Sequence, residues 1–98
     1  MTTFDNIRAW AEARNLIKGA TQQAQMLKFT EEVGELAASI ARNNEDGVVD
    51  AIGDCVVCLT ILAAQRGWDI EECILSAYNE IKDRKGKMVD GVFVREVA

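Results

Sequence analysis

The sequence predicts an all-α protein, a four-helix bundle-like fold with a short C-terminal β-hairpin that forms oligomers. The 98 residues include no proline, so long helices can run without interruption. Hydrophobic residues make up 49% of the chain, and they recur at helical spacing in four segments. A chain of this length suits a single domain over residues 1–98, which buries only about 60–65% of its unfolded surface and therefore gains from self-association.

The first two predicted helices are separated by a break at Gly19. Apolar side chains recur at helical spacing over residues 3–14, which predicts the first helix. Thr21 is suited to cap the second helix, because its hydroxyl can accept from a free backbone N–H. This second helix is expected to extend to about residue 43. Its apolar stripe consists of Met26, Phe29, Val33, Leu36 and Ile40.

The third and fourth helices follow a polar turn at residues 43–47. The third helix is expected to run to about Arg66, and it is apolar nearly all round, which is typical of a helix inside a bundle. The fourth begins with a predicted capping box, in which the Asp69 side chain accepts from the Glu72 N–H. It is expected to close near residues 85–87. Its apolar positions are Ile70, Cys73, Ile74, Ala77, Tyr78 and Ile81.

The C-terminal segment differs from the rest of the chain. Asp90-Gly91 lies between two runs that contain β-branched residues, which is the strongest short signal for a β-hairpin. A two-stranded hairpin on its own is marginally stable in water. We therefore expect this hairpin to pack on the helices or on another subunit.

The three cysteines are predicted to be reduced, buried thiols of a cytoplasmic protein. Cys55, Cys58 and Cys73 all fall in apolar helical patterns, and an odd number of cysteines gives no disulfide framework. Cys55 and Cys58 form a CxxC pair, but there is no second pair and the chain has no histidine. Zinc binding and thiol redox chemistry are therefore disfavoured.

Charge and hydropathy disfavour nucleic-acid and membrane partners. The net charge is −5, aromatic residues make up 6%, and no basic run is present, so a nucleic-acid surface is not expected. The longest apolar run, Cys55–Ala64, is interrupted by Thr60 and is shorter than the ~20 residues of a membrane span. The first residues lack a signal-peptide core.

Two short acidic segments share one pattern. Residues 31–36 read Glu-Glu-Val-Gly-Glu-Leu, and residues 50–55 read Asp-Ala-Ile-Gly-Asp-Cys. Each segment has an acid at its first and fifth positions and a glycine at its fourth. Both segments lie inside predicted helices. Gly34 and Gly53 are costly in helix interiors, and we expect them to allow a close approach of two helices.

Helical spacing places these acids on common faces. At about 100° per residue, Glu32 and Glu35 lie about 60° apart on the second helix, and Asp50 and Asp54 lie about 40° apart on the third. Carboxylates enclosed between helices protonate or destabilise the fold unless they are paired or bind a metal. A site of oxygen ligands suits Mg²⁺ or Mn²⁺. The alternative is a solvated acidic face, in which Lys28 is only an intrahelical partner of the glutamate four residues later.

The two acidic segments together resemble those of the MazG-like all-α nucleoside triphosphate pyrophosphohydrolases. The C-terminal stretch Asn79–Val94 is similar to that of the short, single-domain members, and the resemblance covers about residues 25–94. It implies a helical bundle that forms a homodimer or a dimer of dimers. It also implies active sites in or beside the subunit interfaces.

The resemblance assigns roles to individual acids. The family motif pairs Glu-x-x-Glu on one helix with Glu-x-x-Asp on the next, which implies Glu32, Glu35 and Asp54 as catalytic metal ligands. The third position of the motif falls on Ala51, which cannot bind a metal. Asp50 shares a helix face with the last acid, so we expect it to supply the missing ligand.

The resemblance also implies the chemistry. Mg²⁺, or Mn²⁺, on the carboxylates would bridge the oxygens of a (deoxy)nucleoside triphosphate and lower the pKa of an attacking water, giving a nucleoside monophosphate and pyrophosphate. Glu31 is a candidate to orient or deprotonate that water, or else a solvent-facing glutamate. The remaining candidates are phosphate, sugar or base contacts, with the aromatic residues alternatively in the core: Lys28, Asn79, Lys82, Lys85 with Arg84, Trp10 and Phe29.

The expected function is therefore a Mg²⁺-dependent nucleoside triphosphate pyrophosphohydrolase with a housecleaning role against noncanonical or excess nucleotides. Two alternatives stay open at this point. The first is a non-catalytic helical dimerisation module whose acids keep it soluble. The second is a related pyrophosphohydrolase that acts on phosphoribosyl-ATP.

Overall fold

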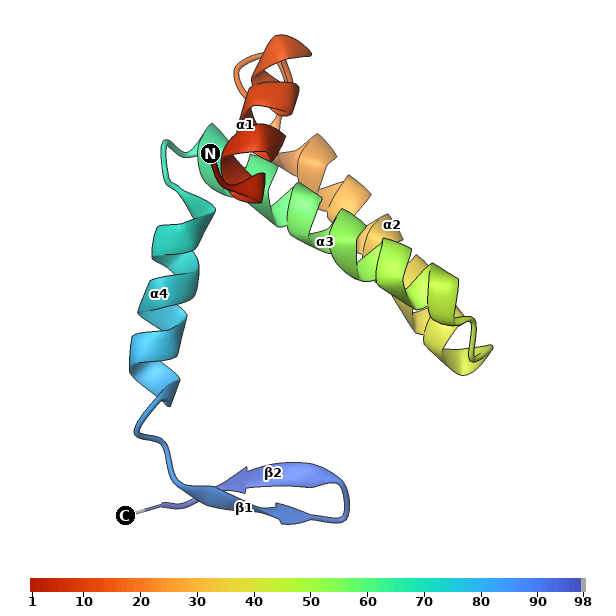
Figure 1. Cartoon of the computed structure of the whole chain (residues 1–98), viewed down its shortest axis with the longest axis vertical. Helices are drawn as coiled ribbons and strands as arrows, with labels where there is room; N and C mark the ends of the chain where they lie inside the picture. Colours follow the sequence, from red (N-terminus) through yellow and green to blue (C-terminus); the bar gives the residue numbers. More distant parts are fainter. Residues whose placement is uncertain (98) are drawn as a thin grey trace.

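The protein has four helices followed by one two-stranded antiparallel sheet (Figure 1). We use a computed structural model of the chain and describe residues 1–97. The all-α class with a small C-terminal hairpin is confirmed. The elements are α1 (Thr3–Ala13), α2 (Gln22–Ala41), α3 (Glu45–Gln65), α4 (Ile70–Ile81), β1 (Gly86–Val89) and β2 (Val92–Arg95).

The first three helices start at side-chain caps. The Thr2 hydroxyl accepts from the Asp5 N–H at 3.1 Å, and the Asp5 carboxylate accepts from the Thr2 N–H at 2.9 Å, which completes a capping box. Thr21 caps α2 as predicted, accepting from the Ala24 N–H at 3.0 Å. Asn44 caps α3 in the same way. These caps satisfy N–H groups that the helices cannot pair internally.

The capping box predicted at Asp69 is wrong. Asp69 occupies the N-cap position of α4, but its side chain makes no capping hydrogen bond among the described residues. One carboxylate oxygen instead lies 3.9 Å from the Arg8 guanidinium. Asp69 therefore begins α4 by its backbone and not by a side-chain cap.

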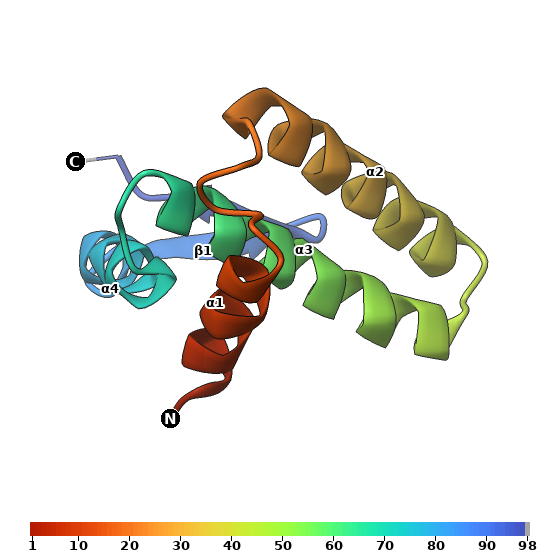
Figure 2. The ribbon, with the colours of Figure 1, turned by 90° about the horizontal axis from the view of Figure 1, so that it is seen from above.

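The centre of the fold is the antiparallel pair of α2 and α3, with α1 packed across α3 (Figures 1 and 2). Ala11 of α1 and Thr60 of α3 are fully buried at that crossing, where the Thr60 hydroxyl donates to the Val56 carbonyl at 2.7 Å. At the C-terminal end of α3, the Gln65 side chain donates to the Leu16 carbonyl at 3.0 Å. This hydrogen bond holds the loop before α2 against the end of α3. These contacts fix the two helices that carry the acids.

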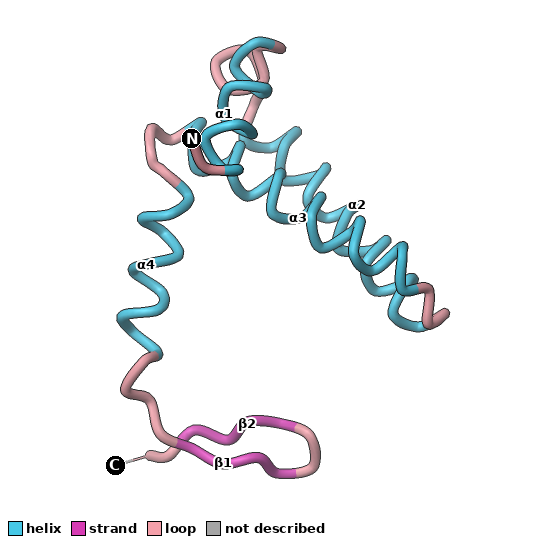
Figure 3. The backbone as a smooth tube through the Cα atoms, in the orientation of Figure 1, coloured by secondary structure: helices cyan, strands magenta, loops and turns pink. Residues whose placement is uncertain are grey.

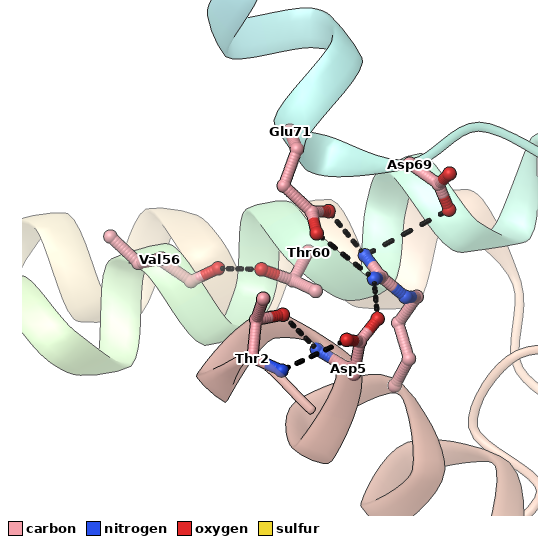
Figure 4. Close-up of polar contacts among 7 residues, drawn as sticks. Thr2, Asp5, Val56, Thr60, Asp69 and Glu71 are labelled. Atoms are coloured by element: carbon pink, nitrogen blue, oxygen red, sulfur yellow. Dashed lines mark hydrogen bonds and ion pairs between the residues drawn. The ribbon is translucent and has the colours of Figure 1, made fainter.

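Arg8 ties α1 to the start of α4 through ion pairs with Asp5, Asp69 and Glu71, and Figure 4 labels these three partners. Its guanidinium donates to the Glu71 carboxylate at 2.6 Å and also pairs with Asp5. A backbone hydrogen bond from Thr2, followed by the Arg8 guanidinium, lowers the pKa of Asp5 to about 2. The same guanidinium lowers the pKa of Glu71. The cluster joins two elements that are far apart in the sequence.

We expect Arg8→Met to flatten the acid dependence of stability. Asp5 and Glu71 have folded pKa values below their ordinary values of 3.8 and 4.5, so their contribution is present above those values and is lost as the pH falls toward the folded ones. Removing Arg8 removes its share of both shifts. Thermal unfolding from pH 7 to pH 2 measures the effect, with Lys18→Met as the control. Parallel curves for Arg8→Met and wild type would refute the assignment.

The segment from residue 70 to residue 95, which we call the arm, extends away from the rest of the molecule (Figures 1 and 3). It consists of α4 and the hairpin, and Ile70 is the residue of α4 that is buried. Cys73 is exposed, so its predicted burial is wrong, whereas Cys55 and Cys58 are buried free thiols as expected. The helix ends at Ile81, before the expected close near residues 85–87.

The hairpin forms where the sequence predicts it. Asp90 and Gly91 have φ values of 50° and 80°, the positive values that a two-residue type I′ turn requires. Met88 pairs with Phe93 across the strands. The Phe93 ring also lies over Gly86, where an added Cβ would come within 2.4 Å of a ring atom. Both strands are exposed along their length, so the hairpin does not pack on the helices of its own chain.

The face of α2 predicted to be apolar and packed is largely exposed. Met26, Val33 and Ile40 are exposed, whereas Phe29 and Leu36 are partly buried. The buried side chains of α2 are instead Gln25 and Glu32. Within one chain, the described residues therefore cover the apolar stripe of α2 only in part.

The whole chain is extended for its size. Its radius of gyration is 16.2 Å, against about 13 Å for a compact domain of this length. Its accessible surface is 7453 Å², against about 5,500 Å² for a compact monomer of 10.8 kDa.

The helix α3 is long and apolar enough to cross a membrane, a test that the central helices of soluble proteins also pass.

Candidate functional site

Three of the predicted metal ligands meet between α2 and α3. Glu32, Glu35 and Asp54 each offer a carboxylate oxygen, and these three oxygens all lie within 4.8 Å of one another. Glu32 and Glu35 are three residues apart on α2 and so lie on one side of it, opposite Asp54 on α3. We call these three residues the carboxylate cluster. It contains acids from both of the similar segments of the sequence.

Glu32 lies deepest in the cluster, with 5% of its surface exposed. One oxygen, Oε1, lies 3.2 Å from the Lys28 ammonium. The other, Oε2, is buried and has no hydrogen-bond partner within residues 1–97. A buried polar atom without a partner costs free energy, and a buried charged one costs more. The position of Oε2 therefore indicates a binding partner that does not belong to the described part of the chain.

The pKa values of two of the three acids are raised, which means that their negative charges are not fully compensated. The negative charge of Glu32 raises the pKa of Glu35. Burial raises the pKa of Asp54, and the nearby charges of Asp50 and Glu32 raise it further. Lys28 carries the basic group closest to Glu32, and it is paired there already. Mg²⁺ and Mn²⁺ prefer carboxylate oxygens as ligands, and this cluster offers three of them close together.

Asp50 lies at the edge of the cluster. It is exposed, and its charge and a hydrogen bond both act to raise the pKa of Asp54, so the two side chains are neighbours. It is not among the three residues whose oxygens converge. Ala51, which occupies the position of the missing acid, is buried with 3% of its surface exposed. The role of Asp50 as a fourth ligand stays a prediction.

We expect Asp50→Asn to weaken Mn²⁺ binding on the order of tenfold, the lower end of what supporting groups of metal sites contribute. Ala51→Ser adds one hydroxyl at the neighbouring position and is expected to leave the affinity nearly unchanged. Titration of Mn²⁺ followed by electron paramagnetic resonance measures both. If the two substitutions have equally small effects, Asp50 is not a ligand.

Lys28 and Glu31 lie beside the cluster on α2. The Lys28 ammonium is 3.9 Å from Glu31 and 3.2 Å from Glu32, so the intrahelical pairing considered for Lys28 is present. Both Lys28 and Glu31 are exposed. The geometry is compatible with a phosphate contact for Lys28 and a water contact for Glu31, and both stay predictions.

The structure does not bring the other predicted contacts to the cluster. Trp10 is exposed on α1, where the Arg14 guanidinium lies 4.4 Å from its ring centre. Asn79, Lys82 and Lys85 are exposed on the arm, which leads away from the α2–α3 pair (Figure 1). The predicted site is therefore divided within one chain between the acids and the arm.

A groove that the sequence analysis did not identify lies on the other side of α3. It has a volume of about 530 Å³ and a mainly apolar lining that includes Met26, Leu59, Ala63 and Trp68. Ala63 follows Asp54 by nine residues, so it points about 180° away from that acid. The exposed Trp68 directly after the helix-ending Gly67 was the signal in the sequence that could have indicated it.

The expectation for the two internal glycines is wrong. A Cβ added at Gly34 or at Gly53 would meet nothing within 4 Å in the described part of the chain. Both residues are exposed. They therefore do not allow a close approach of α2 and α3, whose contact is made by other faces.

Comparison with known proteins agrees with this geometry. The family described as MazG nucleotide pyrophosphohydrolase domain matches residues 20–89, which include α2, α3, α4 and β1. The chain belongs to the MazG family. The match contains the whole carboxylate cluster, so the resemblance drawn from the two acidic segments is confirmed, and the all-α class agrees with that of the family.

One similar protein comes from a phage. It is an uncharacterized 18.2 kDa protein in the rep-hol intergenic region of Haemophilus phage HP1 (strain HP1c1), and it is 48% identical over 64 residues. The aligned region covers 65% of this chain and 39% of the phage protein, so the chain spans well under half the length of that relative. No solved structure matches this chain.

Proposed function

We propose that this MazG-family chain is a Mg²⁺-dependent pyrophosphohydrolase that converts (deoxy)nucleoside triphosphates to monophosphates and pyrophosphate. The observation that carries the proposal is the buried, unpartnered Oε2 of Glu32, which lies with two further carboxylates whose oxygens are within 4.8 Å. A solvated acidic face would expose its acids to water. This one encloses Glu32 and leaves one of its two carboxylate oxygens without a partner in the described residues, as a metal-binding site does.

The proposed reaction adds water at the α-phosphorus. Glu32, Glu35 and Asp54 would hold Mg²⁺ or Mn²⁺, which would supply Lewis acidity to the phosphate oxygens and favour deprotonation of the attacking water. Glu31 accepts the proton that the water loses. The water oxygen bonds to the α-phosphorus, and the bond from that phosphorus to the α–β bridging oxygen breaks. Pyrophosphate leaves with the bridging oxygen, and one water is consumed.

The chain's own basic groups bind the substrate in this proposal. Lys28 is exposed, and its ammonium can donate to a phosphate oxygen once the charge of Glu32 is neutralised. We also propose a homodimer or a dimer of dimers that acts in the cytoplasm and removes noncanonical or excess nucleotides. A non-catalytic module would need none of these groups beside the cluster.

A nucleotide panel tests the proposal. The wild type is incubated with Mg²⁺ and the common and noncanonical (deoxy)nucleoside triphosphates, and pyrophosphate release is measured beside Glu35→Gln and the exposed control Lys18→Gln. We expect release by the wild type and the control but not by Glu35→Gln. Phosphoribosyl-ATP is added to the panel. If that compound alone is hydrolysed, it is the substrate in place of free nucleoside triphosphates. A folded wild type that releases no pyrophosphate would support a non-catalytic module.

A further inference from the structure

We propose that Lys28 pairs with Glu32 only in the metal-free protein, and that metal binding releases its ammonium to bind the phosphates of the substrate. This role rests on the proposed function, because it concerns the same site. It adds the order in which the ligands bind, with the metal ion first and the triphosphate second. Three observations support it.

The first observation is the position of the Lys28 ammonium. It lies 3.2 Å from Oε1 of Glu32 and 3.9 Å from Oε2 of Glu31. Within residues 1–97, no other basic side chain forms an ion pair with Glu31 or with an acid of the carboxylate cluster. Lys28 is therefore the cation that the metal-free site already contains, and it is bound to the deepest of the three acids.

The second observation is that this lysine compensates Glu32 only in part. Oε1 of Glu32 faces the ammonium, whereas Oε2 is buried and has no hydrogen-bond partner in the described part of the chain. A divalent cation among the three carboxylates would contact the same carboxylate that Lys28 holds. Two cations on one carboxylate repel each other, so the more weakly held of the two is expected to leave.

The third observation is that Lys28 is the weakly held one. Its side chain is 57% exposed, whereas that of Glu32 is 7% exposed. Lys28 also precedes Glu32 by four residues on one helix, which is the less favourable order for such a pair. Exposed ion pairs of this kind contribute little and are screened by salt. Release of the ammonium from Glu32 therefore costs little.

A released Lys28 remains beside the cluster, because its backbone is fixed on α2 one turn before Glu32. A triphosphate held at the cluster brings anionic oxygens to this place, and an ammonium donates strong hydrogen bonds to such oxygens. Without metal, the acids repel the triphosphate and the lysine is already engaged. The same lysine thus makes substrate binding depend on the metal. A lysine that acts only as a fixed countercharge would stay on Glu32 in every state.

Lysine acylation followed by mass spectrometry distinguishes the two roles. Three samples are acylated briefly at one pH: the metal-free wild type, the protein with Mg²⁺, and the protein with Mg²⁺ and a non-hydrolysable nucleoside triphosphate analogue. Lys28 is compared with the exposed Lys18 in the same digest. Acylation needs a free amine nitrogen, so an ion pair slows it. We expect Mg²⁺ to speed the labelling of Lys28 about threefold, since exposed ion pairs are weak, and the analogue to slow it again.

Two variants separate the ion pair from the general charge of the cluster. Glu32→Gln removes the partner of Lys28, so Lys28 is expected to react fast without metal and to respond little to Mg²⁺. Glu35→Gln is the matched control, because it removes the same charge from the cluster but leaves the Lys28–Glu32 pair in place. In this control the labelling of Lys28 should stay slow without metal.

Lys28→Met tests the contact with the substrate. Lys28 is exposed, so folding is expected to be retained. In the presence of Mg²⁺, the affinity for the analogue should fall on the order of tenfold, the loss typical of a hydrogen bond to a charged group. Mn²⁺ affinity without nucleotide, followed by electron paramagnetic resonance, should rise because the competing cation is gone.

The outcomes separate this role of Lys28 from the proposed function. If the wild type binds Mn²⁺ but Mg²⁺ leaves the labelling of Lys28 unchanged, the release of Lys28 is overturned and the proposed function stands. Labelling that rises with Mg²⁺ and is not slowed by the analogue overturns the contact with the substrate. A wild type that binds no Mn²⁺ and hydrolyses no nucleotide overturns the proposed function itself.

Discussion

Replacing Glu32 with glutamine is expected to change activity and stability in opposite directions. The substitution keeps the shape of the side chain and removes its charge. Because Glu32 lies deepest in the carboxylate cluster, we expect metal affinity to fall and kcat/KM for nucleotide hydrolysis to drop on the order of 100-fold or more, as for other groups that stabilise transition-state charge. In the metal-free protein, the amide can donate to the neighbouring carboxylates, so the melting temperature is expected to rise.

The pH dependence of the metal-free protein follows from the same contacts. Glu35 and Asp54 have folded pKa values above their ordinary 4.5 and 3.8, so the folded state binds protons more tightly than the unfolded state. Stability is therefore lost as the pH rises from the ordinary values through the raised ones. Since Glu32 is the main cause of the Glu35 shift, Glu32→Gln should reduce this loss. The share of the loss that comes from the burial of Asp54 should persist in Glu32→Gln, because burial is the largest cause of the raised pKa of Asp54.

Thermal unfolding with and without Mg²⁺, together with pyrophosphate release, measures these effects. Glu12→Gln is the matched control, because Glu12 is an exposed glutamate outside the cluster. The control should leave activity, stability and the response to Mg²⁺ unchanged. A Glu32→Gln protein that is less stable without metal, or that keeps wild-type activity, would contradict a metal site at this position.

The sequence predicts the elements that depend on local signals. Thr21 caps α2, and the Asp90-Gly91 turn joins the two strands, because each of these features is decided by a few neighbouring residues. The convergence of Glu32, Glu35 and Asp54 was also within reach of the sequence. It requires only helical spacing and two helices that face each other.

The sequence could not predict which surfaces meet. Spacing alone marks Met26 as part of an apolar face, but Gln25 on the neighbouring face is the residue that is buried. Asp69 has the right identity and spacing for a capping box, yet its carboxylate makes no capping hydrogen bond and lies 3.9 Å from Arg8, sixty-one residues earlier. Long-range contacts of this kind depend on how the helices are arranged. The distance between Lys82 and the acids also depends on how the helices are arranged, so the sequence could not predict it.

Introducing the missing acid at Ala51 is expected to make folding depend on metal. Ala51 is buried and precedes Asp54 by three residues, so a glutamate there would lie about 60° from that acid on the side of α3 that faces α2. An uncompensated buried charge typically costs on the order of 3–5 kcal/mol. We therefore expect Ala51→Glu to lower the melting temperature sharply without metal, and Mg²⁺ or Mn²⁺ to restore more of it than in the wild type.

Ala51→Gln separates the charge from the volume. Glutamine is as large as glutamate but cannot bind the metal as an anion, so its loss of stability measures the cost of fitting the side chain into a closed position. The metal-dependent gain of Ala51→Glu over Ala51→Gln then reports the new ligand. Equal losses in both variants, with no response to metal, would show that position 51 does not face the cluster. In that case the alanine is a packing residue, and the site works with the acids that the structure already brings together.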